Sequence, residues 1–96
     1  MSKNITFSEA NKTLELYVPI VARVHGGTHP EFHEVREIYD DIVKKVNEAG
    51  KEKAELSEDF AKLRKVTNNY TIPADVCESY EAVYNILAEL DKAYQA

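Results

Sequence analysis

Apolar residues recur every three or four positions along most of the chain, which is the spacing that places side chains on one face of an α-helix. The first stripe consists of Ala10, Leu14, Tyr17, Val21 and Val24. Later stripes consist of Phe32, Val35, Ile38, Tyr39, Ile42, Val46 and Ala49, then Leu56, Phe60, Leu63 and Val66, and then Val76, Tyr80, Val83, Leu87, Leu90 and Tyr94. The pattern therefore predicts four helices, over about 7–25, 29–49, 52–67 and 73–94.

Residues near the ends of the first stripe predict the limits of the first helix. Thr6 and Glu9 of "TFSE" form a capping box at its start. Pro19 removes one backbone donor inside the helix and predicts a kink. Gly26-Gly27 predicts the end of the helix, because glycine tolerates the left-handed conformation of a helix C-cap.

Glycine and proline also mark the later boundaries. "THPE" predicts the start of the second helix, with Thr28 or His29 as its cap and Pro30 in its first turn. Gly50 predicts the end of this helix, and Pro73 predicts the start of the last one.

Four helices with short connections are typical of an antiparallel up-down four-helix bundle, which is an all-α fold. The 96 residues fit a single domain over 1–96. One alternative stays open, since a glycine costs only about 1 kcal/mol inside a helix. The second and third helices could then form one rod through Gly50, which would favour an intertwined dimer.

The charge balance argues against nucleic acid and membrane as partners. Twelve Lys and Arg residues against 17 Asp and Glu give a net charge of −5, and the basic residues form no stripe. The sequence has no apolar run near the roughly 20 residues that a membrane span needs, and its first residues do not resemble a signal peptide. The single cysteine, Cys77, agrees with a cytoplasmic location.

Three histidines, His25, His29 and His33, follow one another at four-residue steps. His25 shares the inward face of the first helix with Val21, so it is either a metal ligand or a hydrogen-bonded structural residue, and the structural role is favoured. His29 lies in the cap region of the second helix, which favours a capping or exposed role. Because the glycines and proline between them break the helix, the histidines can converge only across this corner.

Other candidate chemistry is limited to two features. His33 and Glu37 form an H-x-x-x-E pair, a spacing by which helical bundles present metal ligands, although the same face is also compatible with simple solvation. Cys77 could be a thiolate at a helix start, but no histidine is near it in sequence, which favours a small buried residue. The sequence contains no convincing nucleophile with its base and no cofactor loop, so an enzyme is the least favoured interpretation.

The segment "YVPIVARVHGGTHPEFHEVREIYDDI" resembles the iron–sulfur cluster repair di-iron family (RIC), whose domains are hemerythrin-like four-helix bundles. The resemblance rests on VHG followed by HPE. The later segment "EDFAKLRKVTNNYTIPADVCESYEAVYNILAELDK" is similar to the family in its L-x-x-L-R, T-x-P and Tyr-rich helix. Together these motifs cover roughly residues 14–93.

The resemblance implies a bundle that holds two irons and restores damaged iron–sulfur clusters under nitrosative or oxidative stress. His25 matches a family iron ligand. Ala49 and Lys53 stand where the family has an H-x-x-x-E pair, and "KAELSEDF" and "NITFSEANK" lack the family's other histidines. The family's final H-x-x-x-E would follow Ala96. Because a di-iron centre needs about six or seven ligands, the expected iron binding is weak or shared across a dimer.

The expected ligands are therefore His25, His29, His33 and Glu37, with iron as the metal. The function implied by the resemblance is iron–sulfur cluster repair or iron handling. The alternative is a metal-free helical interaction module that pairs with itself or with a full-length repair protein. The expected partners are a second copy of the chain or an iron–sulfur or repair protein.

Overall fold

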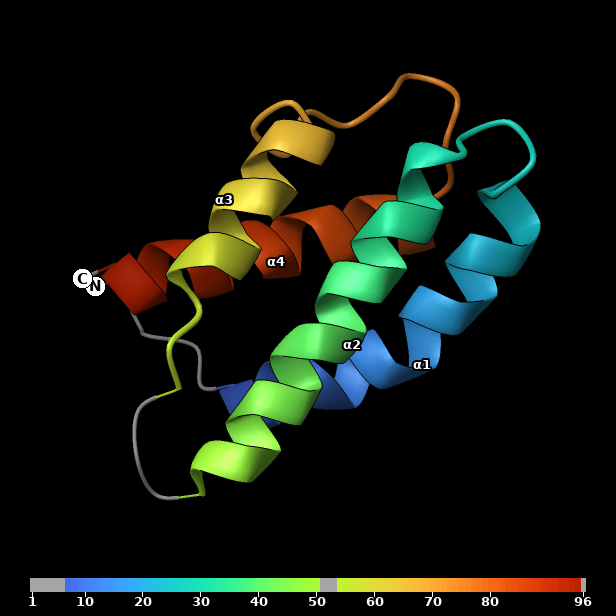
Figure 1. Cartoon of the computed structure of the whole chain (residues 1–96). Coiled ribbons are helices and arrows are strands. Elements are labelled where there is room, and N and C mark those ends of the chain that lie inside the picture. Colours follow the sequence, from blue (N-terminus) through green and yellow to red (C-terminus); the bar gives the residue numbers. More distant parts are fainter. Residues whose placement is uncertain (1–6, 51–53, 96) are drawn as a thin grey trace, which may run out of the picture.

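The computed structural model describes residues 7–50 and 54–95, and these ranges contain four helices (Figure 1). The helices are α1 (Phe7–His25), α2 (Glu31–Ala49), α3 (Ser57–Val66) and α4 (Glu78–Gln95). The predicted all-α class and the number of helices are confirmed. The predicted third helix, over about 52–67, begins only at Ser57, since residues 54–56 are not helical. The predicted cap at Thr6 and the position of Lys53 lie outside the described residues.

The four helices enclose one hydrophobic core. Helix α1 packs against both α4 and α2, and α2 packs against α3. Each helix contributes buried apolar side chains, the largest being Tyr80, Tyr84, Phe32, Leu14, Ile42, Leu63 and Leu87. Within the described ranges, no helix is long and apolar enough to cross a membrane.

Helix α1 continues through Pro19, and Figure 1 shows its two halves running in different directions. The change of direction agrees with the predicted kink, because proline cannot donate to the carbonyl four residues earlier. The predicted inward position of Val24 is wrong, since its side chain is 62% exposed. At about 100° per residue, the buried face of Val21 and Ala22 continues to His25 and leaves Val24 outside.

The ends of the other helices differ in part from the prediction. Helix α2 ends at Ala49, and Gly50 has a φ of 61°, so the alternative of one rod through Gly50 is wrong. Helix α4 begins at Glu78 rather than at Pro73. Its first turn is closed by the backbone N–H of Glu81, which donates to the carbonyl of Cys77 at 3.1 Å. Residues 71–77 therefore form part of a connection between α3 and α4.

Candidate functional site

Polar side chains from three parts of the chain meet where α1 ends, α2 begins and α4 begins. We call this group the histidine corner, and its members are His25, His29, Glu31, Asp75, Cys77 and Tyr80. The corner exists because α1 packs against α4 and α2, which brings the ends of these helices together. Two of the four predicted ligands, His25 and His29, lie in it.

His25 lies beside Cys77, with 3.1 Å between Nε2 of the ring and Sγ of the thiol. Cys77 is exposed, so the prediction of a small buried cysteine is wrong. The cysteine also directly precedes α4, where the free backbone N–H groups of a helix favour negative charge. An imidazole in contact with a thiol can take up its proton, which is the arrangement of an activated nucleophile.

His29 contacts two carboxylates. Its Nδ1 lies 3.0 Å from Oε2 of Glu31, and its Nε2 lies 3.0 Å from Oδ1 of Asp75. Both ring nitrogens must donate to satisfy these two acceptors, which requires the protonated imidazolium. The hydrogen bond to Glu31, followed by the hydrogen bond and charge of Asp75, accordingly raises the pKa of His29 above 6.5, against an opposing effect of desolvation.

Tyr80 forms the floor of the corner. Its ring is fully buried, and its centroid lies 5.5 Å from the ring centroids of both His25 and His29. Its hydroxyl lies 2.9 Å from that of Tyr84 and donates to Glu31 at 3.3 Å. Desolvation, together with the bond to Tyr84, raises the pKa of Tyr80 far above its ordinary value, so the phenol stays neutral.

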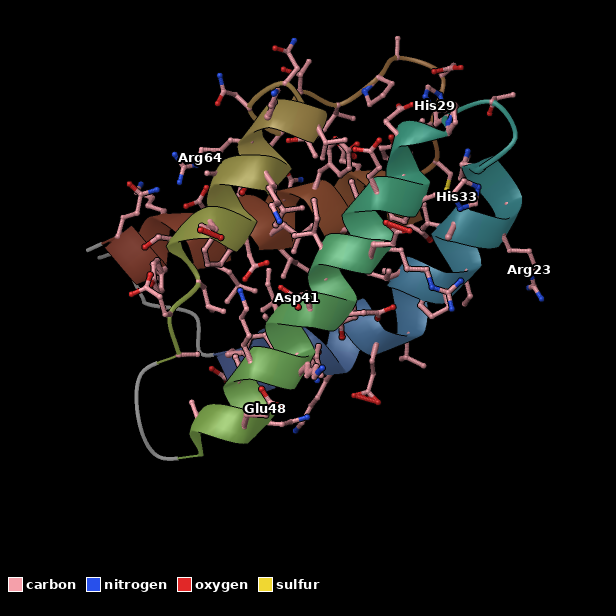
Figure 2. The ribbon with its side chains drawn as sticks, viewed as in Figure 1. Arg23, His29, His33, Asp41, Glu48 and Arg64 are labelled. Carbon is pink, nitrogen blue, oxygen red and sulfur yellow. The ribbon has the colours of Figure 1, made fainter. Side chains whose placement is uncertain are left out.

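His33 lies next to the corner but takes no part in it. An added Cβ on Gly26 would lie only 2.3 Å from Nε2 of His33 and 2.3 Å from the carbonyl oxygen of Ala22. Gly26 therefore has no room for a side chain, and the predicted left-handed cap is wrong, since the φ of Gly26 is not positive. Figure 2 shows His29 and His33 at the same end of α2.

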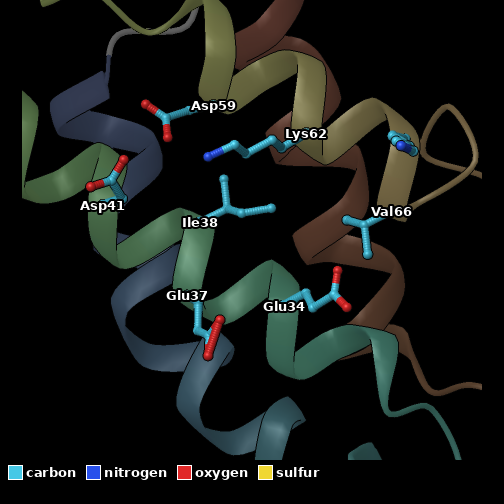
Figure 3. Close-up of a pocket in the computed structure, with 8 residues that line it drawn as sticks. Glu34, Glu37, Ile38, Asp41, Asp59, Lys62 and Val66 are labelled. Carbon is cyan, nitrogen blue, oxygen red and sulfur yellow. The ribbon is translucent and has the colours of Figure 1, made fainter.

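Glu37 lies away from the corner, in a groove between α2 and α3. The groove is lined by the acidic residues Glu34, Glu37 and Asp41 of α2 and by Asp59, Lys62 and Lys65 of α3 (Figure 3). The ring of His33 lies against Gly26 at the end of α1. The predicted pair of His33 and Glu37 is thus not brought together with His25 or His29.

Among residues 7–50 and 54–95, no three His, Cys, Asp or Glu side chains are placed so that they could hold one metal ion. His25, His29, His33 and Glu37 are not grouped around one position in this structure, and their role as metal ligands stays a prediction. The pair of His25 and Cys77 offers one nitrogen and one sulfur, 3.1 Å apart.

Two carboxylates outside the corner are buried and fully paired. Asp59 is 1% exposed, and its Oδ2 accepts from Nζ of Lys45 at 2.9 Å. Burial raises the pKa of Asp59, and the bond from Lys45 opposes this rise. Asp91 is 3% exposed, and its carboxylate accepts from Arg64 at 2.9 Å, from Tyr70 at 2.8 Å and from Gln95 at 2.6 Å.

The predicted ligands leave out four members of the corner, namely Glu31, Asp75, Cys77 and Tyr80, although Cys77 was considered as a thiolate. Cys77 and Asp75 lie 52 and 46 residues from the histidines that they contact. Tyr80 was predicted only as a member of the last apolar stripe, and its hydroxyl is buried against that of Tyr84. For Asp75, Cys77 and Tyr80, the one signal in the sequence was that they precede or open the last helix.

Comparisons of the chain with models of known protein families, with curated proteins and with solved structures gave no match. The similarity to the RIC family therefore rests on the sequence motifs quoted above and stays a prediction.

Proposed function

We propose that the chain is a small hemerythrin-like relative of the RIC family that handles iron in iron–sulfur cluster repair under nitrosative or oxidative stress. In this proposal its helices form an antiparallel up-down bundle, and the protein works in the cytoplasm. The observation that carries the proposal is the 3.1 Å contact between Nε2 of His25 and Sγ of Cys77 at an exposed corner. Imidazole and thiolate are both ligands for iron.

Iron in this proposal is cargo. One chain offers a nitrogen and a sulfur, so the remaining positions around the ion would be filled by water or by the acceptor of the iron. Such binding is weak and exchangeable, which suits transfer better than storage. The thiol must lose its proton to bind, so iron binding should strengthen as the pH rises.

The test is anaerobic reconstitution with ferrous iron, followed by elemental analysis. Cobalt(II) is a useful second probe, because a sulfur ligand adds a charge-transfer band to its spectrum. We expect His25→Ala and Cys77→Ser each to remove most of the bound metal, and Cys77→Ser to remove the band. His33→Ala is the matched control, because it deletes a neighbouring histidine outside the corner. No metal in the wild type, or equal loss in the control, would refute the proposal.

A second candidate function is that of a helical interaction module. It is favoured by an apolar stripe on the outside of α1, formed by Leu16, Ile20 and Val24, which are 63%, 44% and 62% exposed. We call these residues the α1 stripe. If the module interpretation is correct, the protein should bind a repair protein or a second copy through this stripe. A charged residue at Ile20 should then abolish association without changing metal content.

A further inference from the structure

Cys77 and His25 together have the features of a reactive thiol. Cys77 is exposed, and Nε2 of the half-buried His25 lies 3.1 Å from its Sγ. Cys77 also begins the first hydrogen-bonded turn of α4, because its carbonyl accepts from the backbone N–H of Glu81. The free N–H groups of such a turn favour negative charge on the sulfur. A nucleophile, a base within hydrogen-bonding distance and access from solvent therefore coincide at one atom.

The ring of His25 is held beside the thiol by the core. It lies edge-on to the buried ring of Tyr80, with 5.5 Å between the ring centroids and 87° between the ring planes. Tyr80 belongs to α4, the helix that Cys77 directly precedes. The packing that orients the imidazole therefore also sets its distance from the sulfur.

We infer that Cys77 is a thiolation site, at which the sulfur exchanges with a low-molecular-weight disulfide, RSSR. In this step Sγ attacks one sulfur of the disulfide, and its proton passes to Nε2 of His25. The S–S bond of RSSR breaks, and the leaving sulfur takes the proton back from the imidazolium. The products are a mixed disulfide between Cys77 and one RS group, and one free thiol, RSH. The disulfide itself is the oxidant.

The mixed disulfide should persist on the protein. Cys77 is the only cysteine in the 96-residue sequence, so no second thiol of this sequence can displace the RS group and close an internal disulfide. Release requires an external thiol, by the reverse of the same exchange. The modification is therefore reversible, with one RS group per chain.

Charges near the thiol favour one kind of disulfide. Asp75 and Glu78 are both exposed and lie two residues before and one residue after Cys77. The imidazolium of His29 is already paired with Asp75 and Glu31. These groups carry more negative than positive charge, which favours a cationic disulfide such as cystamine over an anionic one such as oxidised glutathione.

This inference goes beyond the iron proposal and does not depend on it. Exchange needs only the thiol and its base, and both are present in metal-free protein. If the iron proposal is also correct, thiolation removes the sulfur ligand and prevents metal binding. The two proposals can fail separately, because exchange is measured without metal and metal content is measured on the reduced protein.

The experiment measures the rate at which cystamine modifies the reduced, metal-free full chain. Intact-mass spectrometry of acid-quenched samples counts the groups added per chain. We expect one group, at Cys77, and a second-order rate constant at least about 10-fold above that of N-acetylcysteinamide at the same pH. His25→Gln should remove this advantage, and circular dichroism checks that the variant remains helical. His33→Gln is the matched control, because the ring of His33 lies against Gly26.

The kinetics of the wild type and of these variants decide the inference. A wild-type rate no higher than that of N-acetylcysteinamide overturns it, and so does an equal loss of rate in His25→Gln and His33→Gln. Charge is tested by the ratio of the rates with cystamine and with oxidised glutathione. We expect this ratio to exceed that of N-acetylcysteinamide and to fall in Glu78→Gln. A ratio no higher than that of N-acetylcysteinamide overturns the choice of a cationic disulfide.

Discussion

The histidine corner and the two buried carboxylates both consist of paired polar side chains. They differ in that the corner is exposed to solvent and the carboxylates are buried. Asp59 and Asp91 are almost completely buried, and each forms an ion pair with a basic side chain of another helix. At the corner, Cys77 and Asp75 are exposed, and His25 has its contact on the surface. The buried carboxylates connect α3 to its neighbours, whereas the corner keeps its reactive atoms in reach of solvent.

This difference separates a structural role from a chemical one. A buried charge is costly unless every acceptor is satisfied, so its partners must stay in place. An exposed thiol or imidazole loses little free energy when its partner is absent, because water can replace that partner. Such groups can therefore exchange one partner for another. We therefore expect substitutions at the buried carboxylates to change stability, and substitutions at the corner to change reactivity. The following predictions test this contrast in order of decreasing effect on stability.

Replacing Asp91 should have the largest effect. Asp91→Ala removes the acceptor for Arg64, Tyr70 and Gln95, and we expect it to lower the free energy of unfolding by about 3 kcal/mol. Urea denaturation measures this change. The control is Glu89→Ala, an exposed carboxylate on the same helix, for which we expect a change within about 0.5 kcal/mol. Equal effects of the two substitutions would contradict the structural role of Asp91.

The close approach at Gly26 should give the next largest effect. Gly26→Ala places a methyl group against the carbonyl of Ala22 and the ring of His33, and we expect a loss of about 2 kcal/mol. Gly27→Ala is the matched control, because an added Cβ there meets nothing within 4 Å. Thermal denaturation of both variants makes the comparison, and similar melting temperatures would show that the end of α1 tolerates a side chain at Gly26.

The charge on His29 predicts a specific pH dependence. Because its pKa is raised above 6.5, the stabilisation from Glu31 and Asp75 is fully present below pH 6.5 and is lost as the pH rises through the pKa of the folded state. We expect the melting temperatures of wild type and His29→Gln to differ more at low pH than at high pH. NMR titration of the ring checks the cause, and a midpoint at or below 6.5 would contradict it.

His25 should contribute least to stability and most to reactivity. We expect His25→Gln to change the free energy of unfolding by no more than about 0.5 kcal/mol. In the same variant, alkylation of Cys77 by iodoacetamide should become slower, because the imidazole nitrogen beside Sγ, a base within reach of the thiol, is gone. Mass spectrometry of timed samples gives both rates. Unchanged alkylation would mean that the contact has no chemical consequence.

The spacing of apolar residues was sufficient to predict the four helices and most of their buried faces, because a helix face depends only on residues that are close in sequence. The spacing did not predict the burial of Asp59 and Asp91, since the basic side chains that pair with them come from other parts of the chain. It also placed Val24 on the buried face of α1. That prediction was wrong because the last inward position of the helix is occupied by His25. The contact of His25 with Cys77 could not be predicted, because nothing local to either residue specifies which helix ends meet.

The packing of α1 on α4 has a consequence for the order of folding. This pairing joins the two ends of the chain, whereas α2 and α3 are neighbours in sequence and also pack together. Closing a long loop costs more entropy than closing a short one, so the α2–α3 pair should form early and the α1–α4 contact late. The histidine corner would then be assembled in the last step. A corner substitution that lowers stability, such as His29→Gln at low pH, should accelerate unfolding and leave the rate of folding almost unchanged.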